Sequence, residues 1–232
     1  MESVISRVEP LAQQVRDYVY NQIISGAIDP SETYSVSELA QQLGVSRTPV
    51  REAIMQLEEI GLVAIIRNKG FRAVEVNAAD IISAFQLRYL LEPFCAEKAA
   101  AHSAGEGSVV VGELEAAMRD MKRASTANDR KQFMLADRQF HEVLLSVPGN
   151  DRLTRAVNGA RDATYVRGLS TFSADRTWVE IYAEHEQILA AVRDGDAVQA
   201  AGAMRSHICA TGEHLLRLMG SDTEGDWLGV EA

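Results

Sequence analysis

Apolar side chains recur at helical spacing near the start of the chain. In the first such stretch they occupy every fourth position, at Leu11, Val15, Val19 and Ile23. A stripe of this period places all four side chains on one face of an α-helix. We expect this helix to end near Ser25 and Gly26 and to pack beneath the elements that follow it.

A second helix is predicted to begin near Val36. The run Ser35–Glu38 has the form of a capping box, in which a hydroxyl bonds one free amide of the first turn and a glutamate reaches back to another. Gly44 stands where a left-handed residue is needed to leave the helix. Between these two ends lies one apolar face, formed by Leu39, Ala40 and Leu43.

A third helix follows after a tight turn and runs to about Glu59. Ser46 or Thr48 can cap it, and Pro49 is tolerated only in a first turn, where the amide that it lacks would have had no partner. The apolar positions of this helix share one face, which must lie against the domain core: Val50, Ala53, Ile54 and Leu57.

Two short strands are predicted behind the third helix. Leu62–Ile66 is apolar and partly β-branched, and Phe71–Val76 alternates loosely. Asn68–Gly70 forms the tip of the resulting hairpin. Three helices and a hairpin in this order predict a winged helix-turn-helix domain over residues 1–76. Two helices alone are often no more than a packed pair, so the hairpin is what favours this fold.

The winged helix-turn-helix indicates binding to duplex DNA. The N-terminal end of the third helix is exposed, and this is the end that a recognition helix inserts into the major groove. A guanidinium there can bind guanine or a phosphate, and the sequence leaves both open. A basic wing tip with a glycine lets the backbone approach phosphate or enter a minor groove. The candidate DNA-binding residues are Ser46, Arg47, Thr48, Arg51, Asn68, Lys69 and Gly70.

The remainder of the chain has helical periodicity almost throughout, to about Gly220. Glycine, proline and short polar residues interrupt it at 105–107, 128–129, 148–150, 173–175 and 195–196. About six helices without a strand pattern predict an antiparallel bundle over residues 77–220, so the fold class is mainly α. Residues 221–232 are short, acidic and glycine-containing, and we expect a flexible tail there.

The predicted bundle contains a set of possible metal ligands. Asp137 and His141 are four residues apart, which places a carboxylate and an imidazole one turn apart on the same helical face. His185 and His207 lie on two later helices. Such nitrogen and oxygen donors suit zinc, nickel or manganese better than calcium or copper(I), with zinc as the first choice. Hydrogen-bonded core histidines are the alternative that spacing alone leaves open.

One stretch of the first domain resembles a known family. The runs Leu43–Ile54 and Leu57–Val63 are similar to the signature of the GntR family of bacterial transcription regulators. The resemblance implies that the third helix and the wing tip contact operator DNA, through the residues that match Arg47, Thr48 and Arg51. Ser37 departs from the pattern, because some members have a DNA-contacting arginine there.

The second domain resembles the FCD domain, the ligand-sensing bundle of many GntR regulators. The carrying motif is Asp-x-x-x-His followed by one histidine on each of two later helices. The resemblance implies that these four residues hold a divalent metal facing an effector cavity: Asp137, His141, His185 and His207. Six bundle helices are closer to the shorter FCD subgroup than to the one with seven.

Arg88 and Glu92 resemble the arginine and the glutamate of the first FCD helix. There the arginine reaches into the cavity, where its fork would clamp the carboxylate of an effector. An i, i+4 ion pair on a solvated face is the alternative for these two residues. Asn158 and Arg161 are further candidates for binding the effector in the same cavity.

Net charge alone argues against a nucleic-acid partner. The chain carries −10, and residues 1–76 hold seven basic against ten acidic residues. DNA contacts only one local surface of a protein, however, and we expect the basic residues of the third helix and the wing to cluster on one side of the domain. No apolar stretch of membrane-spanning length and no signal pattern occurs, so we expect a cytoplasmic protein without a membrane partner. Cys95 and Cys209 are expected to be reduced, packed thiols.

Together these features predict a metabolite-responsive transcription regulator, more often a repressor than an activator. Two copies would form a homodimer that reads a short inverted repeat of double-stranded operator DNA. A small organic acid would bind the metal and Arg88, and would shift the two DNA-binding domains through a hinge at residues 76–80. A constitutive DNA-binding protein with a structural dimerisation bundle is one alternative.

A metal-dependent hydrolase is the other alternative, because a metal with an open coordination position can activate water. The sequence offers no convincing general base beside the four ligands. Glu184 and Glu186 flank His185 but should point away from its face. We therefore do not expect an enzyme.

Overall fold

The computed structural model describes residues 10–24, 27–74, 77–103, 108–164, 176–221 and 227–229. The chain divides into two compact units. The first comprises Met1–Val76 with Asp162–Leu169, and the second comprises Asn77–Arg161 with Ser170–Ala232.

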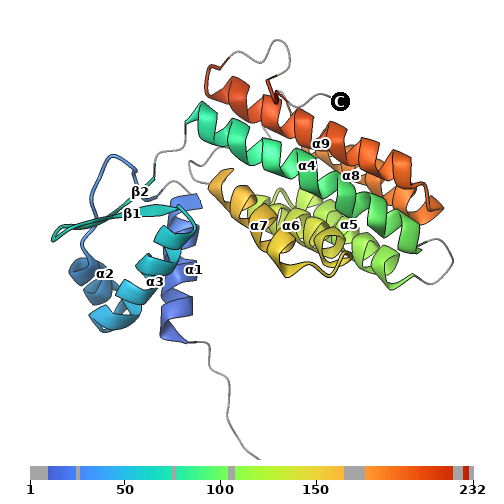
Figure 1. The fold of residues 1–232 in the computed structure, drawn as a ribbon. Coiled ribbons are helices and arrows are strands. Elements are labelled where there is room, and N and C mark those ends of the chain that lie inside the picture. Colours follow the sequence, from blue (N-terminus) through green and yellow to red (C-terminus); the bar gives the residue numbers. More distant parts are fainter. Residues whose placement is uncertain are drawn as a thin grey trace, which may run out of the picture. The chain divides into compact units, whose positions relative to one another are not determined.

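The described part of the first unit contains α1 (Leu11–Ile24), α2 (Val36–Leu43), α3 (Arg47–Glu59), β1 (Val63–Ile66) and β2 (Gly70–Ala73) (Figure 1). Among these elements α3 is central, because it packs against α1, α2 and β1. The predicted order of three helices followed by a hairpin is confirmed.

The apolar stripe of α1 faces the core with one shift in its first turn. Val15, Val19 and Ile23 are buried, but Leu11 is 53% exposed and the neighbouring Ala12 is buried in its place. An α-helix has about 3.6 residues per turn, so a series spaced by four residues drifts around the helix. The first member of the series has therefore rotated away from the face that the later members share.

The ends of α2 follow the predicted capping chemistry. The hydroxyl of Ser35 accepts hydrogen bonds from the amides of Ser37 and Glu38, and Gly44 closes the helix with a left-handed φ of 66°. Before α3, Ser46 has the backbone geometry of an N-cap, but its side chain forms no capping bond. The predicted core face of α3 is confirmed, since four of its apolar residues are at most 2% exposed: Val50, Ala53, Ile54 and Leu57.

The hairpin is joined to the segment that precedes α2. β1 and β2 pair antiparallel in the register that places Ile66 opposite Gly70. The Tyr34 N–H donates to the Phe71 carbonyl at 2.7 Å, and the Tyr34 carbonyl accepts from the Phe71 N–H at 2.9 Å. Gly70 has a φ of 134°, and a Cβ there would lie 2.0 Å from the carbonyl oxygen of Tyr34. Glycine is required at this position for both reasons.

The described part of the second unit is built on six helices: α4 (Ala78–Ser103), α5 (Val109–Thr126), α6 (Arg130–Ser146), α7 (Asp151–Thr164), α8 (Trp178–Asp194) and α9 (Ala197–Leu218). α4 runs beside α9, as Figure 1 shows, and α5 packs along α6. α8 lies against α4, α5 and α9. The predicted fold class, a mainly α chain with a winged helix-turn-helix followed by a bundle of about six helices, is confirmed.

Several predicted breaks between bundle helices are helix caps. The carboxylates of Asp129 and Asp196 accept hydrogen bonds from backbone amides in the first turns of α6 and α9. Thr177 and Glu180 form a full capping box at the start of α8. Each of these side chains caps the first turn of the helix that follows it. The predicted breaks at 105–107 and 173–175 lie outside the described residues.

Part of the C-terminal segment, for which the sequence predicts a flexible tail, packs against the bundle. Leu228 is 5% exposed, and its carbonyl accepts a hydrogen bond from the side chain of Gln86 at 2.6 Å. The Trp227 ring meets Phe85 edge to face, with ring centroids 6.3 Å apart. Gly212 makes room for it, because a Cβ there would lie 2.3 Å from the indole. The prediction is corrected here, since the packing of Trp227 and the burial of Leu228 outweigh the polar composition around them.

No helix in the described ranges is long and apolar enough to cross a membrane. The two cysteines carry free thiols, and Cys95 is buried. Burial raises the pKa of the Cys95 thiol to about 12, which keeps it protonated at neutral pH.

Candidate metal centre and nucleic-acid interface

The N-terminal end of α3 and the tip of the hairpin present polar side chains to solvent. The first turn of a helix carries amides without intrahelical partners, and cations beside them suit phosphate and base edges. Asn68 sits in the hairpin turn with a left-handed φ of 60°. The structure exposes six of the seven candidate DNA-binding residues: Ser46, Arg47, Thr48, Arg51, Asn68 and Lys69.

Gly70 differs from the other six candidates. It is half-buried, and its missing Cβ is explained by the carbonyl of Tyr34. This glycine therefore fixes the attachment of the hairpin to the chain before α2. The sequence could not distinguish this role from a close approach to phosphate.

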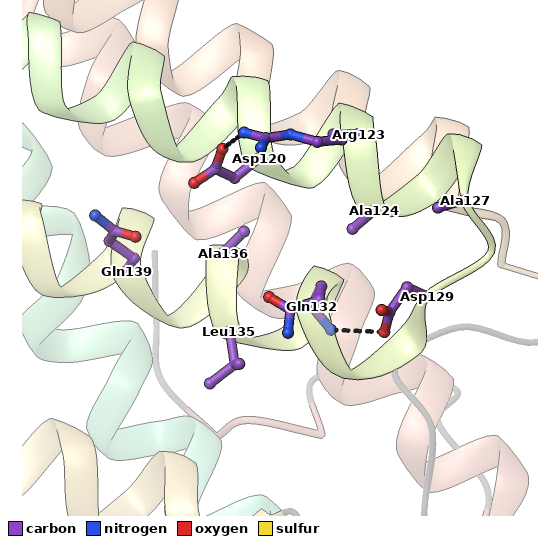
Figure 2. Close-up of a pocket in the computed structure, with 9 residues that line it drawn as sticks. All are labelled: Asp120, Arg123, Ala124, Ala127, Asp129, Gln132, Leu135, Ala136 and Gln139. Atoms are coloured by element: carbon purple, nitrogen blue, oxygen red, sulfur yellow. Dashed lines mark hydrogen bonds and ion pairs between the residues drawn. The ribbon is translucent and has the colours of Figure 1, made fainter.

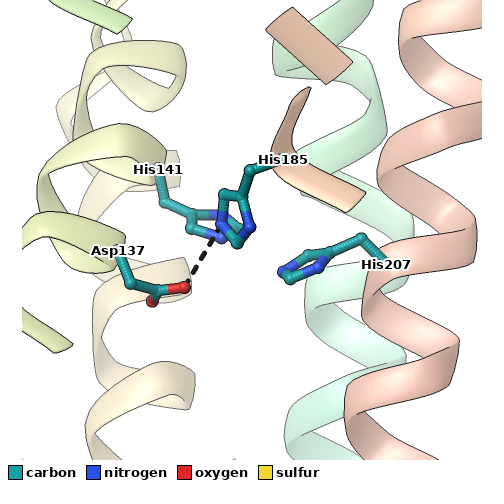
Figure 3. A group of neighbouring side chains, drawn as sticks. All are labelled: Asp137, His141, His185 and His207. Atoms are coloured by element: carbon teal, nitrogen blue, oxygen red, sulfur yellow. Dashed lines mark ion pairs between the residues drawn. The ribbon is translucent and has the colours of Figure 1, made fainter. Parts of the chain in front are cut away.

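Asp137, His141, His185 and His207 converge inside the bundle (Figure 3). The first two lie one turn apart on α6, and the others come from α8 and α9. One potential ligand atom of each residue lies within 4.8 Å of the other three. Four donors arranged tetrahedrally around zinc, each about 2.1 Å from the ion, lie about 3.4 Å from one another. The donors therefore have to draw closer together to share one ion.

The three histidines of this quartet are buried, and the surroundings of two of them disfavour the protonated ring. Burial, assisted by the charge of Arg161, lowers the pKa of His141 to about 3. Burial and the neighbouring His185 hold the pKa of His207 well below its usual value. A metal binds the unprotonated imidazole, so no proton has to be removed from these two rings at neutral pH.

Each imidazole of the quartet is oriented through its Nδ1 atom. When Nδ1–H donates a hydrogen bond, the lone pair of the ring is on Nε2, and this is how metal-binding histidines are usually held. In the described residues, the Nε2 atoms of His141 and His185 are buried without a hydrogen-bond partner. The three Nδ1 bonds run from His141 to Glu92, from His185 to the carbonyl of Ile181 at 2.8 Å and from His207 to Glu184 at 2.7 Å.

Glu92 connects His141 with two arginines. Its carboxylate is 2.6 Å from Arg88 Nε and 3.9 Å from Arg161 Nη1, and it accepts the His141 bond. Burial acts to raise the pKa of Glu92, but the charge of Arg88 and the hydrogen bond with His141 outweigh it and hold that pKa well below its usual value. The predicted i, i+4 partner of Arg88 is therefore present, yet the pair is buried rather than solvated.

Arg161 is bound to the carboxylate ligand of the quartet. Its Nη2 donates to Asp137 Oδ2 at 2.7 Å, while Asp137 Oδ1 lies 3.2 Å from His185 Nε2. Burial acts to raise the pKa of Asp137, but the nearby His185 ring and the charge of Arg161 keep it well below its usual value. One turn earlier on α7, Asn158 Oδ1 is buried without a hydrogen-bond partner among the described residues.

A third carboxylate and arginine lie behind His207, and the sequence reasoning missed their role. Glu184 accepts hydrogen bonds from His207 and from Arg176 Nη2, each at 2.7 Å. Arg176 also donates to Thr211 at 2.8 Å. The expectation that Glu184 points away from the ligands was wrong, because it was judged only against the face of His185 on the same helix. The ligand that it supports comes from α9.

An open hollow lies elsewhere, between α5 and α6 (Figure 2). It has a volume of about 380 Å³, and Asp120, Arg123 and Asp129 are among the residues around it. None of the four candidate ligands lines this hollow. Two further histidines also lie apart from the quartet, since His102 bonds the carbonyl of Lys98 and His214 is buried two turns beyond His207.

Two family models match the chain, one over the winged helix-turn-helix and the other over the helical bundle. The model for bacterial regulatory proteins of the gntR family matches residues 11–72, and the FCD domain model matches residues 83–210. The first match runs from α1 into β2. The second contains the four candidate ligands, and also Arg88 on α4 and Arg161 on α7.

Similar proteins are regulators of transcription. A "Probable D-xylose utilization operon transcriptional repressor" of Paenarthrobacter nicotinovorans is 30% identical over 200 residues, which are 86% of this chain and 86% of that protein. The "HTH-type transcriptional repressor RspR" of Escherichia coli strain K12 is 23% identical, over 100% of this chain and 99% of its own.

Solved structures share the fold. Escherichia coli McbR/YncC has a TM-score of 0.72 at 20% identity and covers 91% of this chain and 99% of its own. A GntR regulator of Rhodococcus sp. RHA1 has a TM-score of 0.70 at 20% identity, over 89% of this chain and 97% of its own.

Proposed function

Because the chain belongs to the gntR family and carries an FCD domain, it is a DNA-binding transcriptional regulator, and we propose that a divalent metal and a small carboxylate control it. The metal would be zinc, with nickel and manganese as the other choices for this donor set. The family also sets aside the hydrolase alternative, since its members act on transcription.

The observation that carries the proposal is the orientation of the three imidazoles. Their Nδ1 atoms are all engaged, the Nε2 atom of His141 is buried without a hydrogen-bond partner among the described residues, and that of His185 faces the Asp137 carboxylate at 3.2 Å. A buried polar atom without a partner costs free energy, which an ion between the rings would recover. Asp137 would complete the donor set, held in place by Arg161.

A bound divalent ion would supply a Lewis acid that attracts a carboxylate. Around it, Glu92 and Glu184 would keep His141 and His207 in the ligating tautomer. Arg88, Asn158 and Arg161 would provide the polar groups nearest to an incoming acid. The effector must bind one arrangement of the protein better than another, because equal affinity for both arrangements shifts nothing.

In the cell we place the protein in the cytoplasm as a homodimer on a short inverted repeat. Each copy would insert the start of α3 into a major groove, with Arg47, Thr48 and Arg51 facing bases or phosphates and the wing tip on the backbone beside them. Domains would divide at residues 76–77. The names of the relatives favour a repressor over an activator.

Operator binding in three metal and ligand states tests this proposal. A labelled duplex obtained by selection from random sequences is titrated with chelator-treated protein, with zinc-loaded protein, and with zinc-loaded protein plus malonate. We expect the dissociation constant to change at least severalfold only in the third state. The same result for a His185→Ala variant would show that the bundle site is not the one that responds.

A constitutive regulator with a structural bundle is the second candidate. It is favoured by the pairing of Arg88 and Arg161 with carboxylates of the chain itself, since such a cluster can exist without a ligand. In that case operator affinity stays the same in all three states. Thermal stability would then respond to zinc without any further response to malonate.

A further inference from the structure

Three carboxylates in the bundle are matched one to one with three arginines. Glu92 lies 2.6 Å from Arg88, Asp137 lies 2.7 Å from Arg161, and Glu184 lies 2.7 Å from Arg176. All three arginines are at most 6% exposed. Two of the carboxylates support histidines of the quartet, and the third belongs to it.

The formal charge of these six side chains is zero. The three imidazoles add none, because a histidine that donates Nδ1–H and offers Nε2 to a metal is a neutral ligand. Glu180 also lies near Glu184, but it is solvent-exposed, so water screens its charge. Among the described residues, the buried site is therefore electrically balanced before any ion enters it.

A divalent ion changes this balance by two positive charges. A buried charge without a counterion is costly, and no carboxylate of the cluster is left over to offset it. Four protein donors also leave coordination positions open on an ion that accepts five or six ligands. We propose that the effector is a small dianion of the dicarboxylate class and that it binds only together with the metal. This inference rests on the proposed function of the quartet.

The arginines alone are not expected to recruit such an anion. Each guanidinium already has a carboxylate of the chain beside it, so an anion that enters the metal-free cluster adds an excess negative charge or displaces one of these partners. A monoanion would balance only half of the charge of the ion. Metal and dianion must then increase the affinity of the protein for each other by the same factor.

The test compares two three-carbon chelators that differ by one charge. Malonate and lactate are titrated by calorimetry into zinc-loaded and chelator-treated full-length protein. We expect malonate to bind the zinc-loaded protein more tightly than lactate, by about tenfold or more, as one further unit charge at short range allows. Neither acid should bind the metal-free protein. Equal affinities, or equally tight malonate binding without zinc, would overturn the inference.

Charge variants separate the protein's contribution from the intrinsic chelating strength of malonate. Arg176→Gln leaves one excess charge and should lower the malonate-to-lactate affinity ratio about tenfold, whereas Glu184→Gln leaves three and should raise it. The double variant Arg176→Gln/Glu184→Gln restores the balance and should return the ratio to that of the unaltered protein. Arg193→Gln is the matched control, because it removes the same charge from an arginine that is 52% exposed.

The outcomes distinguish this inference from the proposed function. If the ratio is the same in Arg176→Gln, Glu184→Gln and Arg193→Gln, the charge argument fails even where malonate still changes operator affinity. If the ratio shifts as expected but operator affinity never responds, the dianion site stands and the regulatory role fails. Should Arg176→Gln not fold, judged by circular dichroism, the shape-conserving Glu184→Gln variant decides the matter.

Discussion

Arginine has opposite surroundings in the two units of this protein. On α3, Arg47 and Arg51 stand in solvent. In the bundle, Arg88, Arg161 and Arg176 are buried and each is paired with a carboxylate of the chain. An exposed guanidinium is solvated by water and costs little free energy without a partner, whereas a buried guanidinium needs an anion beside it for the protein to fold. The two arginines of α3 are therefore available to a partner from outside, whereas these three arginines of the bundle are not.

The largest expected effect comes from breaking a buried pair. Arg88→Met leaves the Glu92 carboxylate in the interior without its closest cation, and we expect the free energy of unfolding of the bundle to fall by about 3–5 kcal/mol. Urea denaturation followed by circular dichroism measures this change.

The matched control for Arg88→Met is Arg193→Met. Arg193 pairs with Glu115 at 2.8 Å, a similar distance, but both side chains are partly exposed. The loss of an exposed pair should cost at most about 1 kcal/mol. Equal losses in the two variants would mean that burial does not separate the two kinds of arginine.

Metal binding should have the next largest effect on stability, and we expect it to act on the helical bundle alone. At a zinc concentration a hundred times the dissociation constant, the free energy of unfolding should rise by about 2.7 kcal/mol. His185→Ala should abolish this gain, because the ring lies at the centre of the quartet. His102→Ala is the control, since that imidazole is exposed and bonds the carbonyl of Lys98. Thermal unfolding with and without zinc decides between them.

An exposed arginine should matter for DNA and not for stability. Arg47→Ala is expected to weaken operator binding by about 2 kcal/mol, the loss of one good contact, and to leave thermal unfolding unchanged. Fluorescence anisotropy at a fixed salt concentration measures the affinity. Arg119→Ala removes a 67% exposed arginine from the bundle and should change neither quantity. A stability loss in Arg47→Ala would contradict the comparison.

The last variant acts inside the first unit alone. Gly70→Ala places a Cβ 2.0 Å from the Tyr34 carbonyl oxygen, at a positive φ that side chains rarely adopt, and we expect the free energy of unfolding of this unit to fall by about 2 kcal/mol. Gly112→Ala in α5 is the control, since nothing lies within 4 Å of its Cβ position and alanine favours a helix. Differential scanning calorimetry resolves the two units. A stable Gly70→Ala protein would show that the wing does not depend on this attachment.

Helix ends could be predicted because the residues that make them act locally. Gly44 turns left-handed and Asp129 caps α6 through contacts within a few residues, so neither depends on the rest of the fold. Leu11 and Trp227 were predicted less well. The side on which Leu11 ends up depends on drift along the helix, and Trp227 finds its partners more than a dozen residues away in α4 and α9.

The candidate site divides in the same way. Spacing relates Asp137 to His141 on one helix, whereas the resemblance to the FCD domain was needed to favour His185 and His207 as ligands over hydrogen-bonded core histidines. The link between Glu184 and His207 could not be predicted, because it joins two helices and depends on how far each is rotated in the bundle. Residues beside a ligand in sequence should therefore be judged against every helix that faces the site.

The seating of Trp227 and Leu228 on α4 and α9 has a practical consequence for purification. A stop codon placed just after residue 221 would remove the Trp227 ring that contacts Phe85. The Arg88 guanidinium also contacts the Phe85 ring, 4.8 Å from its centroid. Affinity handles belong at the other terminus for this reason. Because Trp227 is one of only two tryptophans in the chain, tryptophan fluorescence can report whether residues 227–228 are packed on the bundle.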